Sequence, residues 1–541
     1  MNIKIQGFST LSVPDRPHRI SEHENELRVC LTGAPDEPMS PFTFPGGLDL
    51  RPDDILLIPH FEGYRLRADD DKLPLPSVLP ATGTGLSMAF CGVLRGEDYL
   101  LIAIISNLDA RLRLDRVDGV MKPAVEWLPE MGKFGYDREL RFITGKGGIT
   151  ELCKAYRKIA GEKGLVYPLS ERVKKLPVLE KLLGAANVWL WNDDAMDKLY
   201  SRDAVYRKPA PEQVDERIRV AREMKAAGME RVLWSVFDEN VDRRELEAVK
   251  ELGFITSFYD IYTDVIPTEE ADLIPDTRRV RCETRQSLYP DGIIRDPVGN
   301  MVSAWKLMGK DGQFHDQKRI CDRAAVSCLR RNLNEQMKPE RAESLLDGRF
   351  LDVQCVSVHE CYDKRHPMTR REAFGYKREL LEELHEHGLF AGTEVGCEDA
   401  AAAFDYNEGM LSPAEIRAYD AGRRMTHIYR GDEIDPKLTG FMLNEWYRVP
   451  LWELVYHDCV QSYWYWGDST NCAPELIGKR DWFCELWGLP PIYSFKVSDW
   501  DKLKGDIIES YKRTVPKAVS VAGKAMVSFS ERDGQQRSEF E

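Results

Sequence analysis

The 541-residue sequence has no run of about 20 apolar residues, the length that a membrane-spanning helix requires. Its Lys and Arg residues are scattered rather than gathered in blocks, and the net charge is −15. These absences argue against a helical membrane protein and against binding of nucleic acid through a basic surface. The first residues also lack the basic and apolar regions of a secretory signal. We therefore expect a cytoplasmic protein, or one whose export signal has been removed, with a neutral or small polar partner.

Paired cysteine motifs are also missing. The twelve cysteines include no CxxC pair, and only ten histidines occur. Several cysteines lie in apolar runs, which is typical of buried free thiols. The sequence therefore predicts neither a disulfide framework nor a zinc cluster, and we expect no cofactor and no metal.

Length and turn patterning indicate several domains. A chain of 541 residues is too long for one hydrophobic core. Residues 1–145 contain short apolar runs separated by Pro, Gly and Asp, the pattern of a β-sandwich. Residues 146–185 have the apolar spacing of short helices, and we expect them to link the sandwich to a second domain.

From residue 186 to residue 498 strands and helices alternate, which predicts βα units and a parallel sheet. We expect strands at 187–191, 231–237, 255–261, 350–358, 389–395, 438–444, 460–466 and 491–495. Amphipathic helices at 211–228, 243–252 and 370–387 each end at or beside a glycine, the residue that favours the conformation after a helix. Eight strands over this length predict a (β/α)8 barrel of the TIM type.

Two further segments complete the predicted architecture. An insertion at about 263–338, between the third and fourth strands, is expected to hold hairpin strands at 280–285 and 302–308 and a helix at 316–336. Residues 499–541 should form a helix, a strand and a charged tail. We expect the tail, 531–541, to be disordered because it is rich in charge.

Two neighbouring predicted strands each carry one carboxylate in an apolar or small-residue setting. Asp352 lies early in the strand at 350–358, and Glu394 lies in the strand at 389–395. Both should face the same end of the barrel, where barrel enzymes hold their active sites. Such a pair can cleave a glycosidic bond by double displacement, with Asp352 as nucleophile and a protonated Glu394 as acid/base. The alternative for either residue is a structural buried acid or an ion pair.

Acidic and aromatic residues recur at the ends of the other predicted strands. Carboxylates bind sugar hydroxyls, and aromatic rings cover the apolar face of a pyranose. The candidates for substrate binding are Trp191, Asp238, Asp260, Tyr262, Glu445, Trp446, Trp466 and Asp468. Each also has a structural alternative, because aromatic residues fill cores and acids pair with arginines.

The barrel segment resembles glycoside hydrolase family 129, the α-N-acetylgalactosaminidases, and more distantly the endo-acting enzymes of family 101. The resemblance covers about residues 100–500 and rests on a β-sandwich before a barrel, on Phe350-Leu351-Asp352-Val353, on the segment 360–370, and on Gly392-Thr393-Glu394. In those families an Asp nucleophile ends the fourth strand and an acid/base Glu ends the fifth. The resemblance therefore implies these roles for Asp352 and Glu394.

The same resemblance implies an α-linked galactose-type sugar as substrate, with an N-acetyl group favoured, as in mucin-type O-glycans. Within the predicted insertion, Trp305 and Lys306 are further candidates for contact with this sugar, by position only. The spacing of Asp352 and Glu394 suits the exo-acting family.

Three other interpretations of the same residues stay open. An α-galactosidase-like hydrolase would use Glu445, on the predicted sixth strand, as its acid/base. A metal-dependent barrel enzyme would use oxygen-rich ligands. Its candidate ligands are Asp238, Asp260, His359 and Glu394. A non-catalytic barrel that only binds carbohydrate is the third interpretation.

Overall fold

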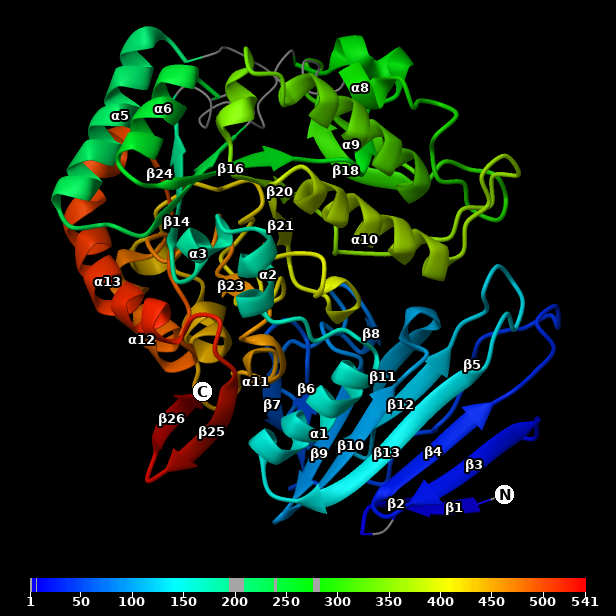
Figure 1. The fold of residues 1–541 in the computed structure, drawn as a ribbon. Helices are drawn as coiled ribbons and strands as arrows, with labels where there is room; N and C mark the ends of the chain where they lie inside the picture. The colour runs from blue at the N-terminus through cyan, green and yellow to red at the C-terminus, as the bar shows by residue number, and fades with distance from the viewer. Residues whose placement is uncertain (1, 6, 194–208, 238–240, 276–282) are drawn as a thin grey trace.

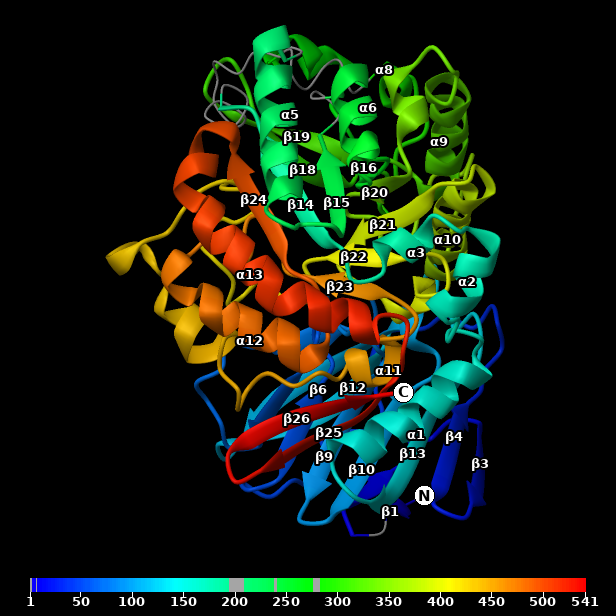
Figure 2. The same cartoon turned by 60° about the vertical axis from the view of Figure 1, so that its left-hand side comes forward.

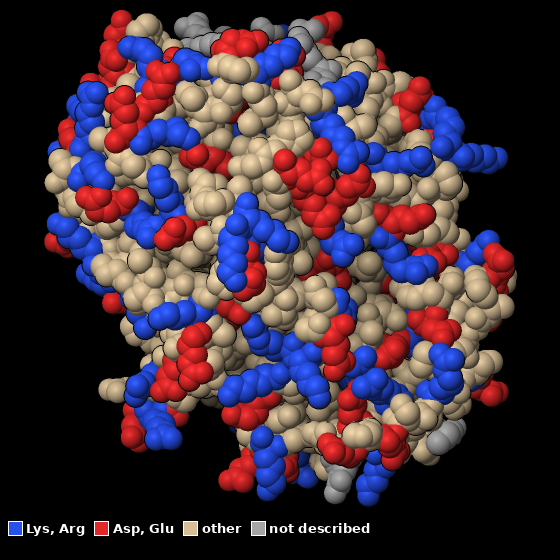
Figure 3. Space-filling view, in the orientation of Figure 1, with Lys and Arg blue, Asp and Glu red and all other residues tan. Residues whose placement is uncertain are grey.

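The computed structural model describes residues 2–5, 7–193, 209–237, 241–275 and 283–541. A β-sandwich lies below a (β/α)8 barrel in Figure 1, as the sequence predicts. Acidic and basic side chains are interspersed over the face shown in Figure 3. Among the helices of the described ranges, none has the length and apolar character needed to cross a membrane.

The sandwich is built from two antiparallel sheets. The larger sheet has the order β3 (His18–His23), β4 (Glu26–Leu31), β13 (Arg138–Lys146), β10 (Asp98–Ile104), β9 (Phe90–Arg95), β6 (Ile55–Ile58) and β7 (Tyr64–Arg67). The smaller sheet has the order β5 (Phe42–Thr43), β12 (Val120–Trp127), β11 (Ala110–Val117) and β8 (Val78–Pro80). Alternate residues of these strands are buried, as in β4, where Leu27, Val29 and Leu31 enter the core.

Short elements flank the sandwich. A two-stranded sheet of β1 (Asn2–Ile5) and β2 (Ser9–Ser12) precedes it. Three helices follow it, α1 (Ile149–Glu162), α2 (Leu169–Lys175) and α3 (Leu179–Leu182). Helix α1 lies against β10 and β13 of the larger sheet, and the chain then enters the barrel (Figure 2).

All pairings between neighbouring barrel strands are parallel. The strands are β14 (Ala186–Trp191), β15 (Val232–Val236), β16 (Ile255–Asp260), β20 (Gly348–Leu351), β21 (Phe390–Glu394), β22 (Tyr406–Glu408), β23 (Gln461–Tyr463) and β24 (Ile492–Lys496). β24 pairs back onto β14, so the barrel is closed except between β23 and β24 of the described chain. Its outer helices include α5 (Pro211–Ala226), α6 (Arg243–Glu251), α10 (Arg370–Glu386), α12 (Ile477–Trp487) and α13 (Trp500–Val521).

Two glycines set the packing of the barrel interior near its fourth and fifth strands. A Cβ atom at Gly348 would lie 2.2 Å from the ring of Phe390, and one at Gly392 would lie 2.2 Å from the ring of Tyr406. Because glycine has no side chain, each strand leaves room for the aromatic ring of its neighbour.

The sixth strand is not where the sequence predicts it. Residues 438–444 form a single π-helical turn (Leu438–Met442), and the strand is β22, with only three residues. Two of those three residues, Asn407 and Glu408, are polar but fully buried and hydrogen-bonded. A buried polar strand has no apolar run, so its pattern cannot be recognised in the sequence. Residue Glu445 therefore does not end a barrel strand.

The fourth strand and the insertion also differ from the prediction. β20 ends at Leu351, because Val353 adopts a left-handed backbone conformation with φ of 51°, so Asp352 follows the strand. The insertion contains β17 (Asp264–Val265), α8 (Glu283–Gln286), β18 (Ser303–Met308), β19 (Phe314–Arg319) and α9 (Asp322–Gln336). The strand predicted at 280–285 is thus wrong over its described residues, which begin α8. The partner of β18 is β19, whose residues 316–319 the prediction assigned to the helix.

The C-terminal tail is ordered, so the prediction of disorder is wrong. β25 (Met526–Arg532) and β26 (Gln535–Phe540) form a hairpin. Asp533 and Gly534 between them both have positive φ, 51° and 73°, as a two-residue hairpin turn requires. Phe529 is buried, and the ring of Phe540 lies 4.8 Å from that of His457. On β26 the charged Arg537 and Glu539 are exposed at alternate positions.

Candidate active site

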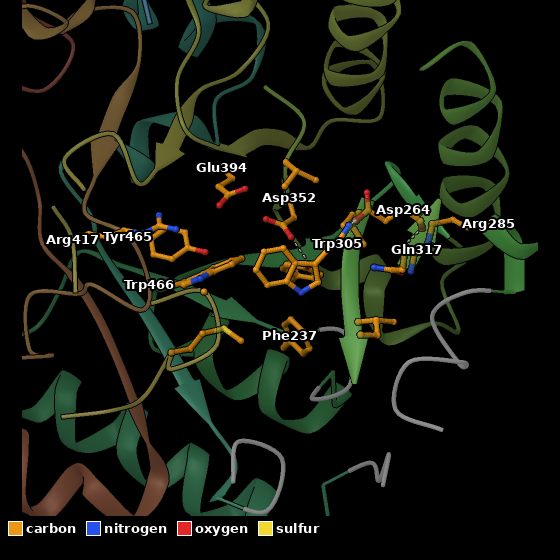
Figure 4. A pocket seen from close by; sticks show the side chains of 16 residues that line it. Phe237, Asp264, Arg285, Trp305, Gln317, Asp352, Glu394, Arg417, Tyr465 and Trp466 are labelled. Atoms are coloured by element: carbon orange, nitrogen blue, oxygen red, sulfur yellow. Dashed lines mark hydrogen bonds between the residues drawn. The ribbon is translucent and has the colours of Figure 1, made fainter. Parts of the chain in front are cut away.

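A pocket opens at the carboxyl ends of the barrel strands (Figure 4). Barrel strands and the segments directly after them supply Phe237, Tyr259, Asp352, Glu394, Tyr465 and Trp466. The insertion supplies one wall with Asp264, Arg285, Trp305, Leu307 and Gln317. The connection between β22 and β23 closes another side with Arg417, Gly422 and Met425.

The two predicted carboxylates meet in this pocket. Figure 4 shows Asp352 and Glu394 next to each other above Trp466 and Trp305. The register of the two strands places them there. Leu351 of β20 pairs with Thr393 of β21, and each acid is the residue that follows in its chain segment. The two carboxyls are close enough for each to influence the pKa of the other.

Backbone strain accompanies each acid. The residues that follow them, Val353 and Val395, have φ of 51° and 58°. A β-branched residue is disfavoured in this region, at a cost of about 1–3 kcal/mol. The backbone N–H group of Val353 favours the carboxylate form of Glu394 and so opposes the effect of burial on its pKa.

Burial dominates the ionisation of the pair. It raises the pKa of Asp352 well above the usual range, and the neighbouring charge of Glu394 raises it further. Burial also raises the pKa of Glu394, against the opposing effects of Arg417 and Tyr465. The Tyr259 hydroxyl donates a 2.6 Å hydrogen bond to Oδ2 of Asp352. Burial therefore favours the protonated form of both carboxyls, compared with exposed acids.

The insertion wall carries aromatic and polar groups suited to a sugar. Trp305 is 44% exposed, and its backbone N–H donates to Oδ2 of Asp264 at 3.2 Å. The guanidinium of Arg423 lies 4.4 Å from the Trp305 ring centre. Within the described residues, the buried Oδ1 of Asp264 and the buried Nε1 of Trp466 have no hydrogen-bond partner. A ligand hydroxyl can satisfy such groups, which are costly to leave unpaired.

Beneath the pocket lies Glu408, which the sequence analysis missed. Its carboxyl accepts hydrogen bonds from Asn187 at 2.7 Å and from Trp189 at 3.0 Å. Burial raises its pKa to about 8. The Trp189 ring stacks on Trp191 and meets Trp466 edge-on, each at 5.5 Å, so Glu408 holds the aromatic floor of the pocket.

Of the predicted substrate-binding residues, Trp305 and Trp466 line the pocket. Four others serve the barrel core or a surface pair. Trp191 is buried and donates to Ser494 at 2.9 Å. The Tyr262 hydroxyl donates to Asp260 at 2.6 Å, and Lys306 pairs with Asp316 at 3.4 Å.

The remaining predicted residues lie elsewhere as well. Asp468 is fully buried and forms an ion pair with Arg480 at 2.7 Å. Glu445 pairs with Lys479, and Trp446 packs under the guanidinium of Arg65 at 4.3 Å. Asp238 lies outside the described residues.

The metal-dependent interpretation gains no support. Within the described ranges, Asp260, His359 and Glu394 do not form a group whose ligand atoms could share an ion. His359 instead lines a second cavity between sandwich and barrel, beside Glu360 and Arg370. Burial lowers the pKa of His359 to about 3.

Four polar pocket residues were not predicted: Asp264, Arg285, Gln317 and Arg417. Asp264 closely follows the third strand and so belongs to the acidic series that the sequence shows at strand ends. Arg285 and Gln317 lie in the insertion, whose strands were misassigned. Arg417 lies in a long irregular connection that has no periodicity to interpret.

Comparison with solved structures identifies proteins of similar fold. No protein-family model and no curated protein matches the chain. Among solved structures it is similar to ligand-free α-N-acetylgalactosaminidase NagBb from Bifidobacterium bifidum, with a TM-score of 0.69 and 19% identity over 97% of this chain and 89% of the other. The GalNAc complex of NagBb gives a TM-score of 0.70 and 19% identity over 100% of this chain and 88% of the other. The chain has the fold of NagBb. The architecture implied by the family resemblance is therefore confirmed.

Removing one buried carboxyl should stabilise the protein at alkaline pH. The folded pKa values of Asp352 and Glu394 are raised, so the pair stabilises the fold below about pH 4 and loses this contribution as the pH rises through the raised values. Glu394→Gln keeps the side-chain shape but cannot ionise. At about pH 8 we expect it to resist urea better than wild type, by about 1 kcal/mol or more, with the difference vanishing toward about pH 4.

Asp468→Asn is the matched control for this measurement. Asp468 is also a buried acid, but it is paired with Arg480. Removing one partner of a buried ion pair costs about 3–5 kcal/mol, so this variant should be less stable than wild type at about pH 8. A Glu394→Gln variant that is also destabilised there would contradict the raised pKa values.

Proposed function

We propose that the protein is a retaining glycoside hydrolase that cleaves α-linked galactose-type sugars, with α-N-acetylgalactosaminides favoured. The observation that carries this proposal is the pair of buried, neighbouring carboxyls, Asp352 and Glu394, in a pocket lined by aromatic rings. The shared fold with NagBb, whose complex with GalNAc has been solved, supports the choice of sugar.

In the proposed reaction Asp352 is the nucleophile. Its carboxylate attacks the anomeric carbon, and the bond from that carbon to the leaving oxygen breaks. Glu394 gives its proton to the leaving oxygen, which departs as an alcohol. In the second step Glu394 takes a proton from water, the water oxygen bonds to the anomeric carbon, and Asp352 leaves as carboxylate. Two inversions give net retention.

Proton placement changes during this cycle. The proposed mechanism starts with the proton on Glu394 and with Asp352 as a carboxylate. Burial raises the pKa of Glu394, which favours its protonated form. The hydroxyl of Tyr259 donates to Asp352 at 2.6 Å and stabilises its carboxylate.

The proximity of the two carboxyls supports retention over inversion. A retaining pair needs a separation of about 5–5.5 Å, whereas an inverting pair needs about 6.5–9.5 Å to admit a water molecule. Two neighbouring acids that influence each other's pKa fit the shorter separation better. The strain and burial of the pair also favour catalysis over binding alone, because both are costly without a chemical role.

The alternative that uses Glu445 is not supported. Its carboxylate pairs with Lys479 outside the pocket, and its backbone carbonyl accepts from Gln536 at 2.9 Å. Glu445 therefore stabilises the contact between the barrel and the C-terminal hairpin.

Azide should separate the roles of the two acids. With p-nitrophenyl α-N-acetylgalactosaminide, Asp352→Ala and Glu394→Ala should each lower kcat by a factor of about 100 or more. Azide should rescue Glu394→Ala to give the α-glycosyl azide, because it attacks the glycosyl-enzyme. With Asp352→Ala, azide should take the place of the missing nucleophile, so this variant should form the β-glycosyl azide. Product anomers are read by NMR.

Glu445→Gln is the control and should keep wild-type activity, since Glu445 pairs with Lys479 and does not line the pocket. Turnover of the p-nitrophenyl α-galactoside, β-galactoside and α-glucoside by the wild-type protein tests which sugar the site prefers. Inversion of the product anomer, or loss of activity in Glu445→Gln with full activity in Glu394→Ala, would contradict the assignment.

The exposed tryptophan of the insertion should bind the sugar. Trp305→Ala should raise KM about tenfold, the loss expected for one aromatic contact, with a smaller change in kcat. Trp446→Ala is the matched control, because Trp446 is similarly exposed, 40% against 44%, but lies outside the pocket. Equal effects of the two substitutions on KM would contradict the prediction that Trp305 binds the sugar.

A further inference from the structure

Two thiols, an imidazole and a thioether converge at the base of the insertion. Sγ of Cys361 lies 3.4 Å from Nδ1 of His366, and Sγ of Cys321 lies 3.9 Å from Sδ of Met368. The ligand atoms of Cys321, Cys361 and His366 all lie within 4.8 Å of one another. We propose that these three residues bind a zinc ion, with Met368 or water as the fourth ligand. The sequence does not predict this site, because its ligands come from separate elements.

The spacings fit a tetrahedral ion. Zn–S bonds of about 2.3 Å and Zn–N bonds of about 2.0–2.1 Å give edges of roughly 3.8 Å between two sulfurs and roughly 3.6 Å between sulfur and nitrogen. The sulfur–sulfur and sulfur–nitrogen contacts of 3.9 and 3.4 Å are close to these values. Thiolate, imidazole and thioether ligands favour zinc or copper(I) over hard cations such as calcium or magnesium.

The backbone prepares Cys361 and His366 for this role. Cys361 and Met368 exchange two backbone hydrogen bonds, of 2.9 and 3.0 Å, which close the loop that carries His366. Nε2 of His366 donates to the backbone oxygen of Asp291 at 2.7 Å. This bond fixes the tautomer in which Nδ1 has a free lone pair, the usual arrangement around a metal-bound histidine.

The sulfur ligands lie in an enclosed, largely apolar setting. Cys321, Cys361 and Met368 are buried, and Ile294 and Ala373 pack around them. Zinc would displace the thiol protons to solvent and bind both sulfurs.

The cluster joins the insertion to the segment that follows Asp352, but the cluster itself lies outside the pocket. Cys321 precedes α9 of the insertion, and its N–H donates to Gly292 at 2.8 Å. Cys361 lies on the segment that follows Asp352. None of the ligands lines the pocket. The ion would therefore fasten the insertion, which carries Trp305 and Asp264, to the barrel, and it would take no part in the chemistry.

Metal content tests the proposal independently of any hydrolase activity. The full chain is incubated with zinc chloride under reducing conditions, dialysed against metal-free buffer and analysed for metal per chain. We expect about one zinc ion per wild-type chain and less than about a tenth of this in Cys361→Ser and His366→Gln. Cys30→Ser is the control, because Cys30 lies outside the cluster, on β4, and it should keep its zinc.

Cobalt provides a readout that needs no variant. Cobalt(II) bound to the reduced wild-type chain should show the thiolate-to-cobalt charge-transfer band of a sulfur site, and added zinc should abolish this band. The proposal is overturned if the band is missing, if zinc content is the same in wild type and Cys361→Ser, or if peptide mapping of the purified chain finds Cys321 and Cys361 joined as a disulfide.

Discussion

The burial of Asp352 and Glu394 side by side is the constraint on which the rest of the site depends. Two acids buried together oppose each other's ionisation, so such a pair is costly and is typical of functional sites. The register of β20 with β21 fixes their positions, and Gly348 and Gly392 allow the aromatic rings of the neighbouring strands to pack beneath them. The left-handed conformations of Val353 and Val395 show that the backbone is strained on both strands.

The sandwich helps to hold this arrangement. Directly after Glu394, the chain reaches Cys397–Asp399, which is bonded to the sandwich. The Glu398 carboxylate accepts from the Ala89 N–H at 2.8 Å and from the Tyr156 hydroxyl at 2.7 Å, and Thr82 donates to Asp399 at 3.0 Å. The segment after Glu394 is thereby attached to a second domain, so the two domains together position the pocket. The insertion completes it from the opposite side.

The sequence predicts the parts of this structure that have strong periodicity or a clear chemical setting. The sandwich, seven of the eight barrel strands and the meeting of Asp352 with Glu394 follow from apolar runs and from acids beside them. The sixth strand could not be predicted, because Asn407 and Glu408 are buried polar residues that form hydrogen bonds with partners distant in sequence. Asp468 and Asp260 could not be separated from true site residues, because their partners Arg480 and Tyr262 are set by tertiary packing. The ordered tail was missed because the Asp533-Gly534 turn was outweighed by the charge around it.

Trapping of the covalent intermediate tests the central claim most directly. A galacto-configured glycosyl fluoride with a second fluorine at C5 forms the glycosyl-enzyme but slows its hydrolysis, so the label stays on the nucleophile. The account predicts that the intact mass rises by one fluorosugar and that peptide mapping places the sugar on Asp352. A label on Glu394 or on any other residue, or a reactive enzyme that forms no covalent adduct, would contradict it.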